Sequence, residues 1–202
     1  MSAQAARPYP LTFSVDYPDR ELNRVTTGFR LILGIPLILL LALFGRGNYP
    51  ASAGLLLFLP VLALLVLRHK YPRWWFDFNL LLARLEARIY TYLFLLRDEY
   101  PSVDEEQAVR LDIVYPDAPN DLNRWLPLVK WFLAIPHYIV MIFLNIAVVI
   151  VVIIAGFAIL FTGRYPRGMF DFVVGVQRWA LRVAAYAFLL VTDRYPPFSL
   201  AP

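Results

Sequence analysis

Long apolar stretches alternate with short charged segments along this chain. In the first half, Leu31–Phe44 and Ala53–Leu67 are almost wholly apolar, and a turn-forming run at residues 45–50 separates them. Apolar stretches of this kind match the hydrocarbon of a lipid bilayer better than the core of a soluble domain. With the residues that flank them, the pattern predicts a transmembrane helical hairpin over about residues 23–69.

The second half contains one apolar stretch, Trp131–Phe161, which carries no charged residue over its 31 positions. This length exceeds the ~20 residues of an ordinary membrane span and is short for two spans. Because its flanking residues match those of the first hairpin, we expect two arms over about residues 123–162, with a turn near Leu144-Asn145. A single long tilted helix is the alternative.

The two halves of the chain spell the same pattern. Residues 13–101 and 111–196 contain, in the same order, the motifs Tyr-Pro-Asp, Asn-Arg, Ile-Pro, Tyr-Pro-Arg, Phe-Asp-Phe and Tyr-Pro. Matching positions lie 98 to 100 residues apart early in each half and 94 or 95 apart later. The pattern therefore predicts two tandem repeats, residues 1–101 and 102–202, in an all-α integral membrane protein.

Each repeat continues beyond its hairpin with a segment of helical periodicity, residues 73–97 and 167–191. Both segments are strongly apolar but carry an aspartate and two arginines on one helix face: Asp77, Arg84 and Arg88, and Asp171, Arg178 and Arg182. Since charges at mid-membrane depth are unfavourable, we expect amphipathic helices in the cytoplasmic interface or packed under the hairpins. If they span the bilayer instead, the protein has six spans and inverted repeats.

The stripe of aspartates and arginines has two interpretations. It forms structural ion pairs with arginines that extend toward water, or the arginines, oriented by the aspartates, bind anionic lipid headgroups or a partner's acidic groups. Aromatic residues beside the apolar segments are expected to anchor them at the headgroup layer. These are Tyr71, Trp74, Trp75, Trp125, Trp131 and Tyr165.

Two short segments alternate apolar and polar residues, as strands with one buried face do. Leu11–Val15 and Val109–Val114 occupy matching places before the two predicted hairpins. We therefore expect two short strands that pair with each other on the cytoplasmic side of the membrane.

Composition and charge agree with a membrane protein. The chain of 202 residues is 60% hydrophobic and 17% charged, against about 45–50% and about 25% in soluble domains. Of its 19 lysines and arginines, Arg46 alone falls at a predicted hairpin tip. Because basic residues near span ends stay cytoplasmic, we expect a multi-pass protein with both termini in the cytoplasm and parallel repeats.

Residues for common chemistry are scarce. The chain has no cysteine and two histidines, His69 and His137. It contains no phosphate-binding glycine loop, no H-E-x-x-H motif and no serine nucleophile elbow. We therefore expect no enzyme activity, no catalytic residues, no metal site and no cofactor. The predicted hairpin arms hold no acidic residue, which argues against proton-coupled transport.

The run Gly-Arg-Tyr-Pro-Arg-Gly-Met-Phe-Asp-Phe at residues 163–172 follows Lys-Trp-Phe-Leu-Ala-Ile-Pro-His-Tyr at residues 130–138. With these motifs the chain resembles a family of small bacterial membrane proteins, the DUF4389 family, known as a domain of unknown function. The resemblance covers nearly the whole chain and is sharpest from Asn123 to Phe198. It implies a bacterial inner-membrane protein and supplies no catalytic residues.

These features favour a non-catalytic scaffold or accessory subunit of a membrane assembly, in contact with anionic lipids. The expected partners are membrane lipids and another membrane protein or further copies of the chain, but not nucleic acid. A channel or passive transporter formed by the repeats is the alternative. A lipid-modifying enzyme is the third hypothesis, for which Asp77 and Asp171 are the only repeated candidates.

Overall fold

A computed structural model describes the chain at residues 9–44 and 53–202. The first half contains β1 (Leu11–Val15), α1 (Arg24–Gly28), α2 (Arg30–Leu33), α3 (Ile35–Phe44), α4 (Ala53–Arg68) and α5 (Arg73–Leu93). The second half contains β2 (Val109–Ile113), α6 (Ala118–Asp121), α7 (Pro127–Leu133), α8 (Ile135–Thr162) and α9 (Arg167–Ala187). The described chain is thus mostly helical, with two short strands.

The two strands form one antiparallel sheet, in which Leu11 pairs with Ile113 and Phe13 pairs with Leu111. These four side chains are buried, because alternate residues of a strand point to the same face. The residues of the opposite face are exposed: Thr12, Ser14, Arg110 and Asp112. The two predicted strands and their pairing are therefore confirmed.

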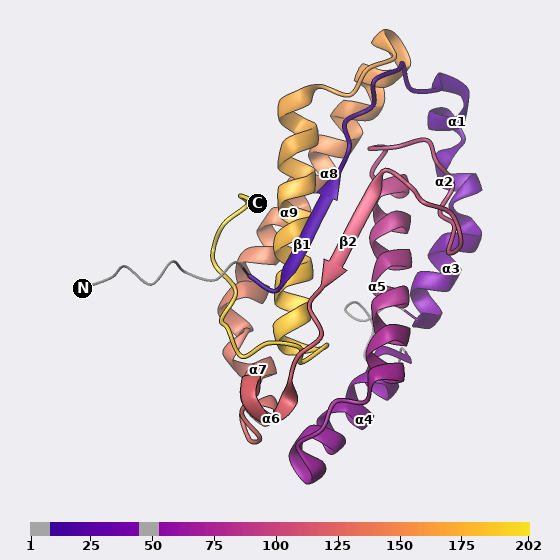
Figure 1. The fold of residues 1–202 in the computed structure, drawn as a ribbon. Helices are drawn as coiled ribbons and strands as arrows, with labels where there is room; N and C mark the ends of the chain where they lie inside the picture. The colour runs from indigo at the N-terminus through magenta and orange to yellow at the C-terminus, as the bar shows by residue number, and fades with distance from the viewer. Residues whose placement is uncertain (1–8, 45–52) are drawn as a thin grey trace.

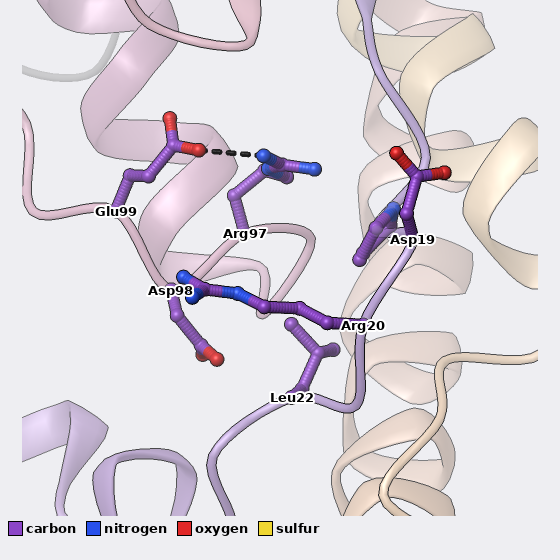
Figure 2. A pocket seen from close by; sticks show the side chains of 7 residues that line it. Asp19, Arg20, Leu22, Arg97, Asp98 and Glu99 are labelled. Carbon is purple, nitrogen blue, oxygen red and sulfur yellow. Dashed lines mark hydrogen bonds and ion pairs between the residues drawn. The ribbon is translucent and has the colours of Figure 1, made fainter.

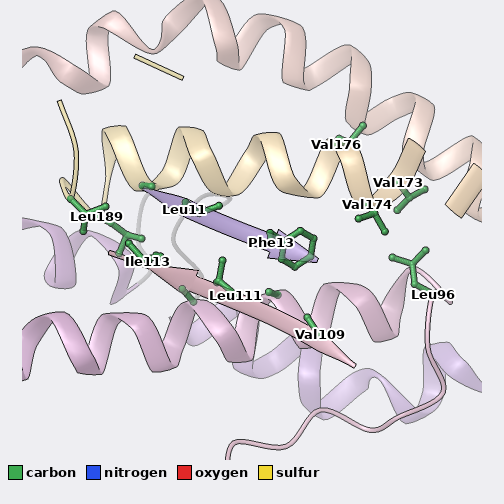
Figure 3. Packing of buried hydrophobic residues seen from close by; sticks show 14 of the residues in the cluster. Leu11, Phe13, Leu96, Val109, Leu111, Ile113, Val173, Val174, Val176 and Leu189 are labelled. Carbon is green, nitrogen blue, oxygen red and sulfur yellow. The ribbon is translucent and has the colours of Figure 1, made fainter. Parts of the chain in front are cut away.

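The helices build two further layers behind the sheet (Figure 1). The buried face of the sheet packs on α5 and α9, with β2 against α5 and β1 against α9. α8 lies along α9, and α3 contacts α5. In the main hydrophobic core, Figure 3 shows Leu11 and Ile113 toward Leu189 at one end of the sheet, and Phe13 toward Val173 and Val174 of α9 at the other. The polar sheet face and the layer of α1–α3 and α8 are therefore on opposite sides of α5 and α9.

Positions that match in the two halves make matching contacts, and these contacts cross between the halves. Tyr17 Oη donates to the carbonyl oxygen of Tyr165, and Tyr115 Oη donates to the carbonyl oxygen of Tyr71. Each strand likewise packs on the long helix of the other half. The core is therefore shared between the halves, and each half supplies a strand to cover the helix of the other.

The prediction of a helical hairpin in the second half is wrong. α8 runs without a break from Ile135 to Thr162, through the expected turn at Leu144-Asn145. The sequence between Pro136 and Gly156 has no glycine or proline to end a helix. The amide of Asn145 donates to the carbonyl oxygen of Met141 at 2.7 Å, so this polar group is satisfied within the helix. The long single helix, the alternative at this position, is the one observed.

The tip of the hairpin predicted for the first half falls at residues 45–50, which lie outside the described residues. α3 and α4 stand on either side of that segment. Within the part of the chain that the structure describes, α8 is the one helix long and apolar enough to cross a membrane.

The layer formed by α1–α3, α7 and α8 exposes apolar side chains. α8 contacts the protein along one stripe, which includes Val148, Ala155 and Ile159, and most of its remaining surface is open. The large exposed apolar residues of α8 include Ile139, Ile142, Phe143, Ile146, Val149, Ile150, Ile153, Phe157 and Phe161. Those of α1–α3 include Val25, Leu31, Ile32, Ile35 and Leu39. This apolar surface lies on the far side of the molecule from the exposed face of the sheet.

The two long amphipathic helices exist, but they are shorter than predicted. α5 ends at Leu93 instead of residue 97, and α9 ends at Ala187 instead of residue 191. The backbone just beyond each helix turns into the left-handed region, with φ of 62° at Leu95 and 56° at Leu190. An α-helix cannot continue through that conformation, so both helices end a few residues before their apolar pattern does.

Candidate functional site

Arg84 and Arg88 lie one turn apart on the side of α5 that faces β2 and the linker between α5 and β2, residues 94–108. Arg84 Nε donates to the carbonyl oxygen of Leu111 at 2.9 Å, and its Nη2 pairs with the Asp112 carboxylate at 2.6 Å. Arg88 Nη1 donates to the carbonyl oxygen of Ser102. The several donors of a guanidinium allow such branched contacts. These two arginines therefore attach β2 and the linker to α5.

Arg178 and Arg182 hold the matching positions on α9. Arg178 Nε donates to the carbonyl oxygen of Phe13 at 3.1 Å, and its Nη1 donates to that of Leu200 at 2.9 Å. Arg182 Nη2 donates to the carbonyl oxygen of Ala201 at 2.9 Å. These arginines therefore attach β1 and the C-terminal segment (residues 188–202) to α9. All four arginines singled out in the sequence lie beside the sheet and donate to backbone carbonyls.

The predicted ion pairs between the aspartates and these arginines are not the ones observed. The carboxylate of Asp77 lies 3.2 Å from Arg73, and that of Asp171 lies 3.3 Å from Arg167. Each pair spans one helical turn, whereas Asp77 and Arg84 are separated by about 10 Å of helix axis. Both pairs are exposed and contribute little to stability. The prediction that Asp77 and Asp171 orient the arginines by ion pairing is therefore wrong.

A groove of about 590 Å³ borders the arginines of α5. It lies between α5, β2 and the linker, and its charged residues are four arginines and four acids: Arg84, Arg88, Arg97, Arg110, Asp16, Glu99, Glu106 and Asp112. Several of these charges are paired within the groove, with Arg84 on Asp112, Arg97 on Glu99 and Arg110 on Asp16. The groove is therefore polar but has no formal net charge, which suits a polypeptide better than a highly charged anion.

A smaller cavity of about 240 Å³ adjoins this groove and shares Arg97 and Glu99 with it. Figure 2 shows the Arg97–Glu99 ion pair and the side chain of Arg20, which extends across the cavity toward residues 98 and 99. Partial burial acts to raise the pKa of Glu99. The hydrogen bonds from Arg97 and from the Ala108 amide outweigh burial, so the pKa of this carboxyl lies below its ordinary value.

The lowered pKa of Glu99 predicts a contribution to acid sensitivity. A carboxyl whose pKa is lower in the folded state stabilises the fold above its ordinary pKa of 4.5. That stability is lost as the pH falls from about 4.5 through the lowered value. We expect the melting temperature of the wild-type protein to fall more steeply below pH 4.5 than that of Glu99→Gln, measured by circular dichroism in detergent. Parallel pH profiles of the two proteins would contradict this assignment.

Two buried cations were not singled out from the sequence. Lys130 is fully buried, with its ammonium nitrogen 2.7 Å from the Asp193 carboxylate and 2.7 Å from the carbonyl oxygen of Thr192. At the matching position, Arg30 is 2% exposed and pairs with Asp98. The sequence feature that could have identified them is a cation and an aspartate that recur at matching places in both halves.

The same aspartates also bind the chain where each apolar segment begins. Asp98 accepts a hydrogen bond from the amide of Asn23 at 2.7 Å, and Asp193 accepts one from the amide of Asn123. The Asn23 side chain in turn accepts hydrogen bonds from the first amides of α1, as an N-cap does. Each aspartate therefore joins the end of one long helix region to the start of an apolar segment.

The six predicted aromatic anchors differ in how far they are exposed. Trp74, Trp125 and Trp131 are exposed, as an anchor in the headgroup layer requires. Tyr71 and Tyr165 are each only 1% exposed, because the crossed contacts between the halves enclose their rings. The prediction that these two tyrosines are interfacial anchors is therefore wrong. The sixth, Trp75, is partly buried and packs edge-on against its neighbour Trp74.

The two histidines take part in structural contacts. His69 Nε2 lies 2.7 Å from the carbonyl oxygen of Leu122. His137 is buried, its Nδ1 accepts a hydrogen bond from the Trp179 indole at 3.1 Å, and its ring stacks on Phe198. Over residues 9–44 and 53–202, no group of three histidine, cysteine or acidic side chains is placed to hold a metal ion.

Over the residues that it describes, the structure is that of a mostly helical protein. It has one helix there that is long and apolar enough to cross a membrane, and an arginine-lined groove beside a small sheet. Residues 125–199 match the model of a family described as "Domain of unknown function (DUF4389)". The resemblance inferred from the sequence is therefore confirmed over these residues. No curated protein and no solved structure matches the chain.

Proposed function

We propose that this chain is a non-catalytic membrane protein, built from two tandem repeats, that acts as a scaffold or accessory subunit. Two features support the proposal. The layer of α1–α3, α7 and α8 exposes many large apolar side chains, which marks an interaction surface. The opposite side carries the polar sheet face and the groove. One side therefore suits lipid, and the other suits a partner protein in water.

The observation that carries the proposal is the difference between the two matching arginine pairs. On α9, the C-terminal segment covers the arginines and supplies carbonyl oxygens to both. On α5, the linker supplies one carbonyl oxygen, that of Ser102, and a groove of about 590 Å³ remains beside Arg84 and Arg88. The C-terminal segment thus occupies a place on α9 that stays open as a groove at the matching place on α5.

The C-terminal segment fits α9 and is a poor fit to α5. A Cβ atom at Gly175 would lie 2.9 Å from the Cβ of Leu200, so the segment approaches the helix closely at this glycine. The matching residue on α5 is Leu81, which is 46% exposed. We infer that the groove on α5 binds a different extended segment, supplied by a partner protein. The carbonyl oxygens of that segment accept hydrogen bonds from Arg84 and Arg88.

The partner site predicts a selective loss on substitution. We expect Arg84→Ala with Arg88→Ala to lower recovery of a stoichiometric partner at least tenfold, because both donors to the bound segment are removed. The measurement is purification of tagged full-length protein from its own membrane in a mild detergent, with mass spectrometry of the retained proteins. The control is Arg194→Ala, which removes an exposed charge outside the groove.

Two outcomes would count against the partner site. Equal partner recovery from the double variant and the wild type would show that the groove is not the contact. Purification of the wild type as a bare homo-oligomer would remove the accessory role and favour a channel, which solute flux into reconstituted vesicles would then test.

A further inference from the structure

The strand β1 and the helices α9 and α8 lie side by side (Figure 1). At the start of α9, the ring of Phe170 is 5.0 Å from the ring of Tyr17, which follows β1. In the last turns of α9, the carbonyl oxygen of Arg182 accepts a hydrogen bond from Tyr9, which precedes β1. The chain around β1 therefore follows α9 over most of its length. Since α8 also runs along α9, the sheet is level with the middle of α8.

This placement conflicts with an upright α8. If α8 crossed the bilayer along its normal, the sheet would lie at the depth of the hydrocarbon. Its exposed face carries Arg110 and Asp112, and Asp16 follows at the end of β1. Exposed charges and open sheet edges are not stable against lipid chains. The long axis of α8 therefore cannot follow the membrane normal unless another molecule covers the whole sheet.

The two ends of α8 have the same chemical character. Arg124 and Trp125 precede α7 and α8, and Arg164 and Arg167 follow α8; all four are exposed. Basic residues are concentrated on one side of a membrane, so basic residues at both ends place both ends on the same side. At 1.5 Å per residue α8 is about 42 Å long, and the hydrocarbon is about 30 Å thick.

We propose that α8, together with α1–α3, lies parallel to the membrane plane within one leaflet. The proposal rests on the membrane attachment proposed above and specifies its geometry. A helix about 10 Å wide fits in the hydrocarbon of a single leaflet, about 15 Å deep. Arg124, Arg164 and Arg167 then reach the lipid phosphates of that leaflet. The sheet face and the arginine-lined groove stay in water on the same side of the membrane.

The absence of cysteine from the chain makes the orientation directly measurable. Single cysteines at Ile142, Ile146, Ile150 and Ile153 carry a spin label at exposed positions of α8. The full-length protein is reconstituted in vesicles of phosphatidylcholine and phosphatidylglycerol, and label depth is read from relaxation by oxygen and by a water-soluble nickel complex. We expect one uniform depth at the four positions. The proposal would be overturned if label depth were greatest at the middle positions, at the bilayer centre, and smaller toward both ends of α8.

A double variant tests whether the two ends of α8 lie on one side. The variant combines Pro119→Cys, before α7 and α8 in the chain, with Gly168→Cys, after α8. Both native residues are exposed, and nothing lies within 4 Å of a Cβ atom built at Gly168. The variant in sealed vesicles reacts with a membrane-impermeant maleimide, and intact-protein mass spectrometry counts the labels on each molecule. We expect molecules with two labels or none. Molecules with one label each would show that α8 crosses the membrane.

Failure of the membrane attachment itself has a separate signature. Protein that does not float with the vesicles in a density gradient would contradict the proposed function, whatever the labels report. Ser14→Cys, on the exposed sheet face, reports whether that face is in water. We expect its maleimide reaction to follow that of Pro119→Cys and Gly168→Cys in every vesicle preparation. Protection of Ser14→Cys in all preparations would overturn the placement of the sheet in water.

Discussion

Asp193→Asn is expected to destabilise the protein by about 3–5 kcal/mol, because it removes the counter-charge of a buried cation. Lys130 is 0% exposed, and its ammonium nitrogen lies 2.7 Å from the Asp193 carboxylate. The substitution also weakens the acceptor for the amide of Asn123, where the second apolar segment begins. The measurement is the free energy of unfolding in detergent micelles, followed by tryptophan fluorescence.

A double variant separates the buried charge from the local packing. Lys130→Met with Asp193→Asn removes both charges, and we expect it to recover most of the stability lost in Asp193→Asn alone. The control is Asp171→Asn, which breaks an exposed pair with Arg167 and should change stability by less than about 1 kcal/mol. A loss in Asp193→Asn as small as that of the control would show that the buried pair is not important for folding.

Gly175→Leu is expected to displace the C-terminal segment and to destabilise the protein by about 1–3 kcal/mol, as overpacking does. It places on α9 the residue that α5 carries at the matching position, Leu81. A Cβ atom at Gly175 would lie 2.9 Å from the Cβ of Leu200 and 3.1 Å from its carbonyl oxygen. Arg178 and Arg182 then lose the carbonyl acceptors that this segment supplies.

Limited proteolysis reports the displacement. Chymotrypsin cleavage after Phe198 removes the last four residues, and we expect a severalfold faster cleavage in Gly175→Leu, measured by mass spectrometry. Gly168→Leu is the matched control, because it lies on the same helix and nothing is within 4 Å of its built Cβ atom. Its cleavage rate should equal that of the wild type. Equal rates in both variants would mean that the segment adapts to a side chain at this position.

The sequence by itself predicted the elements that depend on local pattern. The alternation in Leu11–Val15 predicted a strand, and the helical period after Tyr71 and Tyr165 predicted α5 and α9. The apolar run from Trp131 predicted a membrane segment, but a hairpin was preferred to the continuous helix that runs through Asn145. The repeat suggested a turn there, and nothing in the local sequence supplies one. A local signal, the absence of glycine and proline, was the more reliable guide.

The order of the repeated motifs along the chain was enough to show which positions in the two halves correspond. It showed, for example, that Arg84 and Arg178 occupy corresponding positions. The partners of these arginines were decided by the tertiary structure alone. Each strand crosses to the helix of the other half, and this crossing brings the carbonyl oxygens of Phe13 and Leu111 to the guanidinium groups. The same crossing buries Tyr71 and Tyr165. These contacts join residues 27 to 165 positions apart, and such distant pairs produce no periodic pattern in the sequence. The sequence therefore predicted neither the arginine-lined groove on α5 nor the matching place on α9 that the C-terminal segment covers.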